Sequence, residues 1–185
     1  MDKIKLLQKC QAGDTAAIET LLQTHQSSMF RLALLILDDP AEADEAVQDA
    51  VISAFRALDT FQANASLKTW LYAILVNECR NRWRKRYRST RLKERLFALY
   101  RLFEGPASPE KDVIHHEDNQ IVWKAIQRLG EKHRIPIILR YYQELPVAEI
   151  AQILRINEGT VHSRLNTARQ RLHKELFPLK DDACE

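Results

Sequence analysis

The chain of 185 residues is 45% hydrophobic and 29% charged, which excludes a disordered or fibrous protein and allows one medium core or two small ones. Its formal net charge of +3 is too small to indicate a nucleic-acid partner. The charges are segregated along the chain, however, so their distribution is more informative than their sum.

Only four glycines occur, and apolar residues recur every three or four positions, so we predict helices throughout and no sheet. Asp14 is placed to cap a first helix, whose predicted buried stripe is Ala17, Ile18, Leu21 and Leu22. A second helix is predicted over Met29 to Leu37. Arg31 interrupts this apolar stretch, which is also far shorter than the roughly 20 residues of a membrane span. Because no signal-peptide pattern occurs either, we expect a cytoplasmic protein without membrane insertion.

The third predicted helix has the clearest start in the chain. Asp39 can act as its N-cap, Pro40 stands at the first helical position, and Glu42 follows three residues after the cap. Six acids and no Lys or Arg occur from Asp38 to Asp49, which makes the first half of this helix strongly negative. Its predicted buried stripe consists of Ala43, Val47, Val51, Phe55 and Leu58.

A loop is predicted over residues 61–65, after which Ser66 can cap a long helix. The predicted core side of that helix consists of Leu67, Leu71, Ile74 and Leu75. The helix runs into a basic block, residues 80–95, in which nine Lys or Arg residues accompany one acid. Such a block either contacts phosphate or is solvated. Residues 104–109 contain one glycine and two prolines and are the best candidate for a linker.

A second helical unit is predicted beyond this linker. Its first helix carries the apolar residues Ile121, Val122, Ala125, Ile126 and Leu129 and ends at Gly130. The next helix covers Ile135 to Tyr142, where Pro136 predicts a kink or a late start because it lacks a backbone donor. Leu145 and Pro146 then end this part of the chain.

The last fifty residues have a helix-turn-helix pattern. We predict a short helix over residues 147–154, a turn over 155–157 and a longer helix over 158–177, capped by Asn157. The predicted buried stripe of the last helix is Val161, Leu165, Ala168 and Leu172. This stripe leaves polar side chains outward, as in a helix that reads the major groove: His162, Ser163, Asn166, Thr167 and Arg169.

Three stretches together resemble one family. DDPAEADEAVQDAVISAFRALDTF and NASLKTWLYAILVNECRNRWRKR resemble region two of the sigma-70 superfamily, and LGEKHRIPIILRYYQELPVAEIAQILRINEGTVHSRLNTARQRLHKEL resembles region four. Since nothing between them resembles an intermediate domain, the resemblance is to the extracytoplasmic-function group of RNA polymerase sigma factors. It implies an all-α fold of two small helical domains: region two over 1–95, a flexible linker over 96–116, region four over 117–178 and a tail over 179–185.

The resemblance also implies three sets of site residues. Docking on the coiled coil of the largest subunit of core polymerase is expected for Asp38, Asp39, Glu42, Asp44, Glu45, Gln48 and Asp49. Capture of melted minus-ten bases and nearby phosphates is expected for Phe61, Gln62, Asn64, Ser66, Trp70, Asn77, Arg80, Asn81, Arg84, Lys85 and Arg88. Contact with the minus-thirty-five duplex is expected for Arg140, Thr160, His162, Ser163, Arg164, Asn166, Thr167 and Arg169.

The implied partners are core RNA polymerase, with its flap contacting region four, promoter DNA and an anti-sigma factor. Taken without the resemblance, the acidic run is best interpreted as a solvated helix face, because charge runs usually are solvated. Trp70 is equally a core residue. Arg155 stands where a turn glycine is frequent in the family.

Two other functions remain as alternatives. A helix-turn-helix regulator that acts without polymerase would explain the C-terminal half but not the acidic helix. An enzyme such as a nuclease or phosphotransferase is not expected, because we find no phosphate loop, nucleophile motif or paired carboxylates at motif spacing. His115, His116, Glu117 and Asp118 invite a metal-site interpretation, but they adjoin the linker and are expected to be exposed. The three separated cysteines predict neither a disulfide framework nor zinc, and no cofactor is expected.

Overall fold

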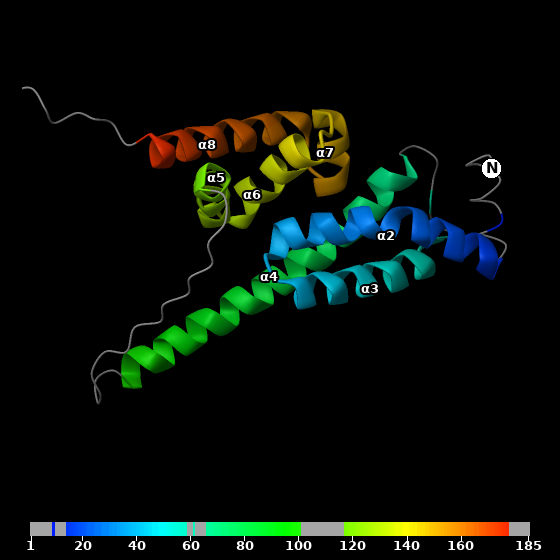
Figure 1. The fold of residues 1–185 in the computed structure, drawn as a ribbon, viewed down its shortest axis with the longest axis horizontal. Coiled ribbons are helices and arrows are strands. Elements are labelled where there is room, and N and C mark those ends of the chain that lie inside the picture. Colours follow the sequence, from blue (N-terminus) through cyan, green and yellow to red (C-terminus); the bar gives the residue numbers. More distant parts are fainter. Residues whose placement is uncertain (1–8, 10–13, 59–60, 62–65, 101–116, 178–185) are drawn as a thin grey trace, which may run out of the picture.

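The computed structural model describes residues 9, 14–58, 61, 66–100 and 117–177, with side chains in the long basic helix described as far as Arg86. Every secondary-structure element in these ranges is helical, which confirms the all-α prediction. Figure 1 shows the helices in two groups, one formed by the first three and the other by the last ones. In chain order they are α2 (Thr15–Leu37), α3 (Pro40–Arg56), α4 (Leu67–Tyr100), α5 (Glu117–Arg128), α6 (Glu131–Ile137), the π-helix η2 (Ile138–Tyr142), α7 (Val147–Leu154) and α8 (Glu158–Leu176).

Helix α2 is continuous, so the prediction of two separate helices in this part of the chain is wrong. Asp14 caps it as expected, because its carboxylate accepts hydrogen bonds from the backbone N–H groups of Ala16 and Ala17. The polar middle of the helix contains neither Gly nor Pro, and the Thr24 hydroxyl donates back to the carbonyl of Thr20, one turn earlier. A polar stretch with such internal bonds does not break a helix whose two ends are held in the core.

Helix α3 begins as predicted and exposes one residue that was expected to be buried. The Asp39 carboxylate accepts from the backbone of Ala41 and Glu42, and Pro40 occupies the first helical position. Phe55 is 39% exposed, so its assignment to the buried stripe is wrong. Alanines form much of the buried stripe of α3 and let the helix approach its neighbours closely. The buried residues are Ala43, Ala46, Val47, Ala50 and Ala54.

Helix α4 is the long helix shared by both parts of the molecule. Its start is fixed by the Ser66 hydroxyl, which accepts from the backbone N–H of Thr69. Its first half is buried against α2 and α3, and burial raises the pKa of the Cys79 thiol to about 12, so this free cysteine is a packing residue. The helix continues to Tyr100, five residues into the expected linker, and Figure 1 shows its second half leaving the bundle. Residues 101–116, with the rest of that linker, lie outside the described residues.

Helix α5 opens the second unit with a narrower buried face than predicted. Ala125, Ile126 and Leu129 are buried, as expected. Ile121 and Val122 are 55% and 40% exposed, so their predicted place in the core is wrong. The apolar face of this helix therefore continues onto the surface beyond the part that α8 covers.

Pro136 lies inside α6, and the predicted irregularity takes the form of a π-helix directly after it. The helix starts at Glu131, so the alternative of a late start is wrong. Pro136 has no N–H to donate to the preceding turn, and the chain continues with wider hydrogen bonds over Ile138–Tyr142. The N–H of Gln143 reaches the carbonyl of Ile138 at 3.1 Å. This local widening places Tyr141 and Tyr142 on the surface.

Helices α7 and α8 form the predicted helix-turn-helix. The Asn157 side chain caps α8 by accepting from the backbone N–H of Thr160 at 2.9 Å, as expected. Arg155 ends α7 in the left-handed conformation, with φ of 53°, although glycine adopts this conformation more readily. Val161, Leu165 and Ala168 are buried as predicted.

The two groups of helices pack against each other through α4 and α7. One cluster of buried apolar side chains runs from α2, α3 and α4 into α6, α7 and α8. In the part of the chain that the structure describes, none of the helices has the length and apolar character needed to cross a membrane.

His133 couples the stability of the second unit to pH. It is buried between α6 and α8, with its Nδ1 atom 3.3 Å from the carbonyl oxygen of Arg164. Burial lowers its pKa below the usual 6.5. The hydrogen bond to the Arg164 carbonyl acts against this shift, whereas the cations Arg171, Lys132 and Arg164 act in the same direction as burial. The unfolded chain therefore binds this proton more readily than the folded chain, so acid favours unfolding.

We predict that the free energy of unfolding decreases as the pH falls through about 6.5 and below, until the folded-state pKa is reached. Urea unfolding at about pH 7.5 and about pH 5.5 measures this decrease. His133→Gln should flatten it, whereas the same exchange at the exposed His162 should leave it unchanged. An equal pH dependence in the wild type and His133→Gln would show that another group is responsible.

Candidate functional site: an acidic helix, a cationic helix and a recognition helix

The residues predicted for polymerase docking lie along one helix and its N-terminal junction. Asp38 and Asp39 are capping residues at this junction. Asp38 ends α2 in the left-handed conformation, and Asp39 caps α3. Asp39 and Glu42 are half-buried. The exposed members of the set are Asp38, Asp44, Glu45, Gln48 and Asp49.

Three of these acids share one cation from α4, which sequence reasoning missed. The Arg82 guanidinium donates from Nη1 to Glu45 at 2.6 Å and to Glu42 at 3.3 Å, and from Nη2 to Asp49. Burial lowers the pKa of Arg82, but its hydrogen bonds to Asp49, Glu45 and Glu42 outweigh that effect and raise it above the ordinary value. Asp44, by contrast, accepts from the amide of Gln48 on its own helix at 2.8 Å.

The arginines of α4 divide into two sets that face different parts of the molecule. Residues four apart share a helix face, so Arg80 and Arg84 form one set and Arg82 and Arg86 the other. Arg82 contacts the acids of α3, and Arg86 donates to the carbonyl of Leu37 at the end of α2. The first set points to α6, where the Glu131 carboxylate accepts from Arg80 and, at 3.3 Å, from Arg84.

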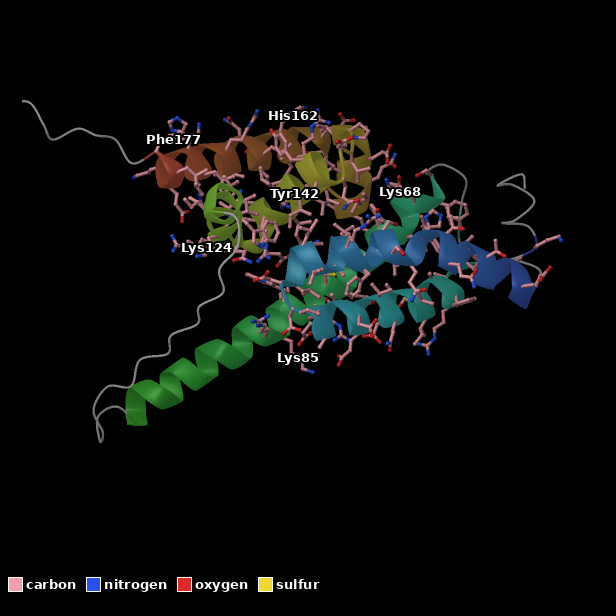
Figure 2. All side chains as sticks on the ribbon, in the orientation of Figure 1. Lys68, Lys85, Lys124, Tyr142, His162 and Phe177 are labelled. Atoms are coloured by element: carbon pink, nitrogen blue, oxygen red, sulfur yellow. The ribbon has the colours of Figure 1, made fainter. Side chains whose placement is uncertain are left out.

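The predicted strand-capturing residues lie on the outer part of α4 and beside its start. Asn77 and Asn81 are exposed one turn apart. The Phe61 and Trp70 rings meet edge to face, with centroids 5.2 Å apart, and both are half-buried. Ser66, which caps α4, is exposed, as are Arg84 and Lys85, and Figure 2 shows Lys85 close to the start of α3. Gln62, Asn64 and the side chain of Arg88 lie outside the described residues.

Asn77 and Arg80 line a cleft of about 280 Å³ between the two groups of helices. Its opposite wall comes from the end of α7, with Ile153, Leu154 and Arg155. The face of α4 that is expected to receive unpaired bases therefore lies opposite α7.

The residues predicted for duplex recognition form an accessible face on α8. Figure 2 shows His162 on the side of α8 that points away from α2, α3 and α4. Arg140 is exposed on η2 and donates to the carbonyl of Leu145 at 2.9 Å, which fixes its direction. The exposed members on α8 are His162, Ser163, Asn166 and Arg169, and the half-buried ones are Thr160, Arg164 and Thr167.

The sequence invites a metal-site interpretation of His115, His116, Glu117 and Asp118, around the start of α5. His115 and His116 lie outside the described residues, and so do the side chains of Glu117 and Asp118. Within the ranges that are described, no group of three or more His, Cys, Asp or Glu side chains is arranged to hold a metal ion.

Two family models match the chain. Sigma-70 region 2 matches residues 21–89, and Sigma-70 region 4 matches residues 119–172. Both ranges lie inside the two expected domains and together span more than half of the chain.

Curated relatives match over almost the whole length. RNA polymerase sigma-H factor of Pseudomonas aeruginosa is 31% identical over 97% of this chain and 96% of its own. ECF RNA polymerase sigma factor SigW of Bacillus subtilis is 30% identical over 95% and 97%. Among solved structures, the sigma factor RpoE in complex with the anti-sigma factor NepR from Bartonella quintana is similar, with a TM-score of 0.64, 26% identity and coverage of 89% of this chain and 98% of that one.

Replacing Arg82 tests its role in holding α3 on α4. We predict that Arg82→Met lowers the free energy of unfolding by about 1 kcal/mol, a modest amount because the three carboxylates are largely solvated. The loss should shrink at about 1 M salt, where the acids of α3 repel one another less. Arg56→Met, which removes an exposed arginine from α3, should change stability less. A loss that does not depend on salt would indicate packing rather than charge as the cause.

Proposed function

Because this chain belongs to the extracytoplasmic-function group of the sigma-70 family and directs promoter-specific transcription initiation, we propose that α3, α4 and α8 divide that work among them. The observation that carries the proposal is the order of three different surfaces along one chain. They are an acidic face on α3, exposed amides among cations on α4, and an outward polar face on α8. Bond chemistry belongs to the polymerase, since a sigma factor is not itself an enzyme.

Helix α3 docks on the basic coiled coil of the largest polymerase subunit. Its exposed acids supply the complementary charge, which speeds association and fixes orientation. Asp44 lies outside the group that Arg82 holds, so its charge is the most available to a partner. Ile52, which is 48% exposed on the same helix, adds apolar area that such a contact can bury.

Helix α4 captures the unpaired nontemplate strand at the minus-ten element. An amide side chain both donates and accepts, so Asn77 and Asn81 can replace the pairing that a base loses on melting. Phe61 and Trp70 provide aromatic faces next to the loop before α4. The cations Arg80, Arg84, Lys85 and Arg88 neutralise the phosphates of the captured strand.

Helix α8 reads the minus-thirty-five duplex. Its polar side chains have the geometry for hydrogen bonding to base edges in the major groove, while Arg140 and Arg164 hold the phosphate backbone. His162, Asn166 and Thr167 make this face less cationic than an Arg or Lys face, so recognition depends more on hydrogen bonds. The flap of the polymerase contacts region four elsewhere.

An anti-sigma factor is the proposed regulatory partner, in the cytoplasm. The similar solved structure is of a sigma factor bound to an anti-sigma factor, which supports the proposal. A helix-turn-helix regulator that acts alone is not favoured, since two sigma regions match in one chain. The overall test is transcription in vitro with core polymerase on a genomic library, with mapping of start sites. Common sequence elements near minus ten and minus thirty-five are expected, and initiation that does not depend on the protein would contradict the proposal.

Charge reversal on α3 tests docking. We predict that Asp44→Lys weakens binding to core polymerase about tenfold at low salt, because like charges then meet across the contact. Fluorescence anisotropy of labelled protein titrated with core polymerase, without DNA, gives the affinity. Glu158→Lys at the start of α8 is the matched control and should bind core as the wild type does. Unchanged affinity of Asp44→Lys would place the docking surface elsewhere.

Removal of one amide on α4 tests strand capture. We predict that Asn77→Ala lowers open-complex formation about tenfold while core binding stays at the wild-type level, because the amide meets only unpaired bases. Permanganate reactivity of promoter thymines and anisotropy with core polymerase measure the two properties. Gln152→Ala, an exposed amide on α7, is the control. Parallel loss of both properties would refute the role of Asn77.

A further inference from the structure

Side-chain hydrogen bonds tie the second helical unit to α4. Glu131 of α6 binds Arg80 and Arg84, the Thr69 hydroxyl donates to Glu149 of α7 at 2.8 Å, and the Tyr72 hydroxyl donates to Gln143 at 2.9 Å. Residues Thr69 to Arg84 span about four turns of α4, so the contacts follow one face of that helix. The helix thus carries polar contacts with region four at both ends of this face, beside the apolar cluster that the units share.

The Glu131 contacts use the groups that the proposed function assigns to DNA. A carboxylate between two arginines offers two anionic oxygens, which is also what a phosphate offers. Arg80 is 28% exposed and Glu131 14% exposed in this pair, so solvent and other anions reach the guanidinium only in part. Glu131 therefore competes with a strand phosphate for Arg80.

A second feature of the interface is a buried arginine without a carboxylate partner among the described residues. Arg134 of α6 is 5% exposed and donates from Nη2 to the carbonyl of Leu35 in α2 at 3.0 Å. Among the described residues, no carboxylate oxygen forms an ion pair with it, and its Nε atom has no hydrogen-bond partner. A buried cation with one carbonyl partner is costly, and the Trp123 ring, whose centroid lies 5.8 Å from the guanidinium carbon, offsets part of that cost. The packed arrangement therefore contains a group that gains hydration when the two units separate.

From these contacts we propose that the packing of region four on α4 is an autoinhibited state, in which Glu131 holds Arg80 and Arg84 in place of a strand phosphate. The inference rests on the proposed DNA role of those arginines. In this state α7 also faces the exposed Asn77 across the cleft, which narrows the approach of a base to the amide. The polar face of α8 points outward and is not covered by α4, so the inhibition concerns the minus-ten strand and not the duplex.

The test uses the full-length protein without polymerase and a fluorescent oligodeoxythymidylate of about 20 nucleotides, whose phosphates need no sequence match. Glu131→Gln weakens the ion pairs, and Tyr72→Phe removes the hydroxyl that contacts Gln143 without altering charge. Both variants should bind the strand about threefold to tenfold more tightly, because a larger fraction of molecules is open. Small-angle X-ray scattering should give a larger radius of gyration for both.

Glu175→Gln is the matched control, because it removes a glutamate that pairs with Arg128 inside region four. It should leave strand affinity and radius of gyration at wild-type values. Wild-type values in Glu131→Gln and Tyr72→Phe would overturn the proposal. Tighter binding by Glu131→Gln alone, with an unchanged radius and an unchanged Tyr72→Phe, would overturn it as well, since removal of one local negative charge would then explain the effect.

The proposed DNA role is tested separately in the assembled polymerase. Arg80→Ala combined with Arg84→Ala should lower open-complex formation and reduce its salt dependence, by a slope of about 0.7 for each single-strand phosphate that is no longer neutralised. Wild-type melting by this double variant would refute the DNA role of the arginines. It would also refute the proposed competition between Glu131 and a strand phosphate for them. Impaired melting by the double variant, together with wild-type behaviour of Glu131→Gln and Tyr72→Phe, would overturn the autoinhibited state alone.

Discussion

The positive charge of α4 is the constraint on which the other contacts depend. Arginines at every second position from 80 to 84, followed by Arg86, place guanidinium groups on two sides of one helix. Like charges at this spacing repel, so a compact chain needs acids on both sides. On the side of α4 that faces α3, these acids are Glu42, Glu45 and Asp49. On the side that faces α6, the acid is Glu131. The acidic run on α3 thus has a partner within the chain besides the one proposed in polymerase.

The contacts between Arg82 and the acids of α3 hold α3 and α4 together in the first helical unit. Arg82 is held by the acids of α3 and stands five residues after Asn77 on the same rigid helix. Buried alanines bring α3 close to its neighbours, so the proposed docking face and the proposed strand-capturing face cannot shift independently. In the proposed function, a polymerase that fixes α3 therefore also fixes where unpaired bases meet α4.

Local features of the fold could be predicted from the sequence because they depend on neighbours in the chain. Asp39 and Asn157 cap helices through groups two or three residues away, and the helix-turn-helix follows from a short apolar pattern. The single α2 could not be predicted, because the polar residues between its apolar ends resemble a break. The exposure of Phe55 and Ile121 could not be predicted either, since apolar periodicity marks a face but not how far a neighbouring helix covers it.

The candidate site shows the same difference between local and distant contacts. Pairing across 33 residues, as for Arg82 and Asp49, has no local signal in the sequence. Glu131 is an ordinary first-turn acid by its sequence, and only the packing of α6 beside α4 gives it two arginine partners.

Several side-chain contacts between the two helical units are polar, which bears on the proposed separation of the units. Each neutral hydrogen bond, such as Tyr72 to Gln143, contributes only about 0.5–1.5 kcal/mol net, because water replaces it on opening. The buried Arg134 offsets part of that gain. Apolar side chains of both units also share one buried cluster, so these polar contacts are only part of what holds the proposed closed state. Ligands that favour one of two states typically contribute a coupling free energy of about 1–3 kcal/mol. In the proposed closed state, a strand phosphate that competes with Glu131 for Arg80 shifts the equilibrium toward separation by its preference for the open form.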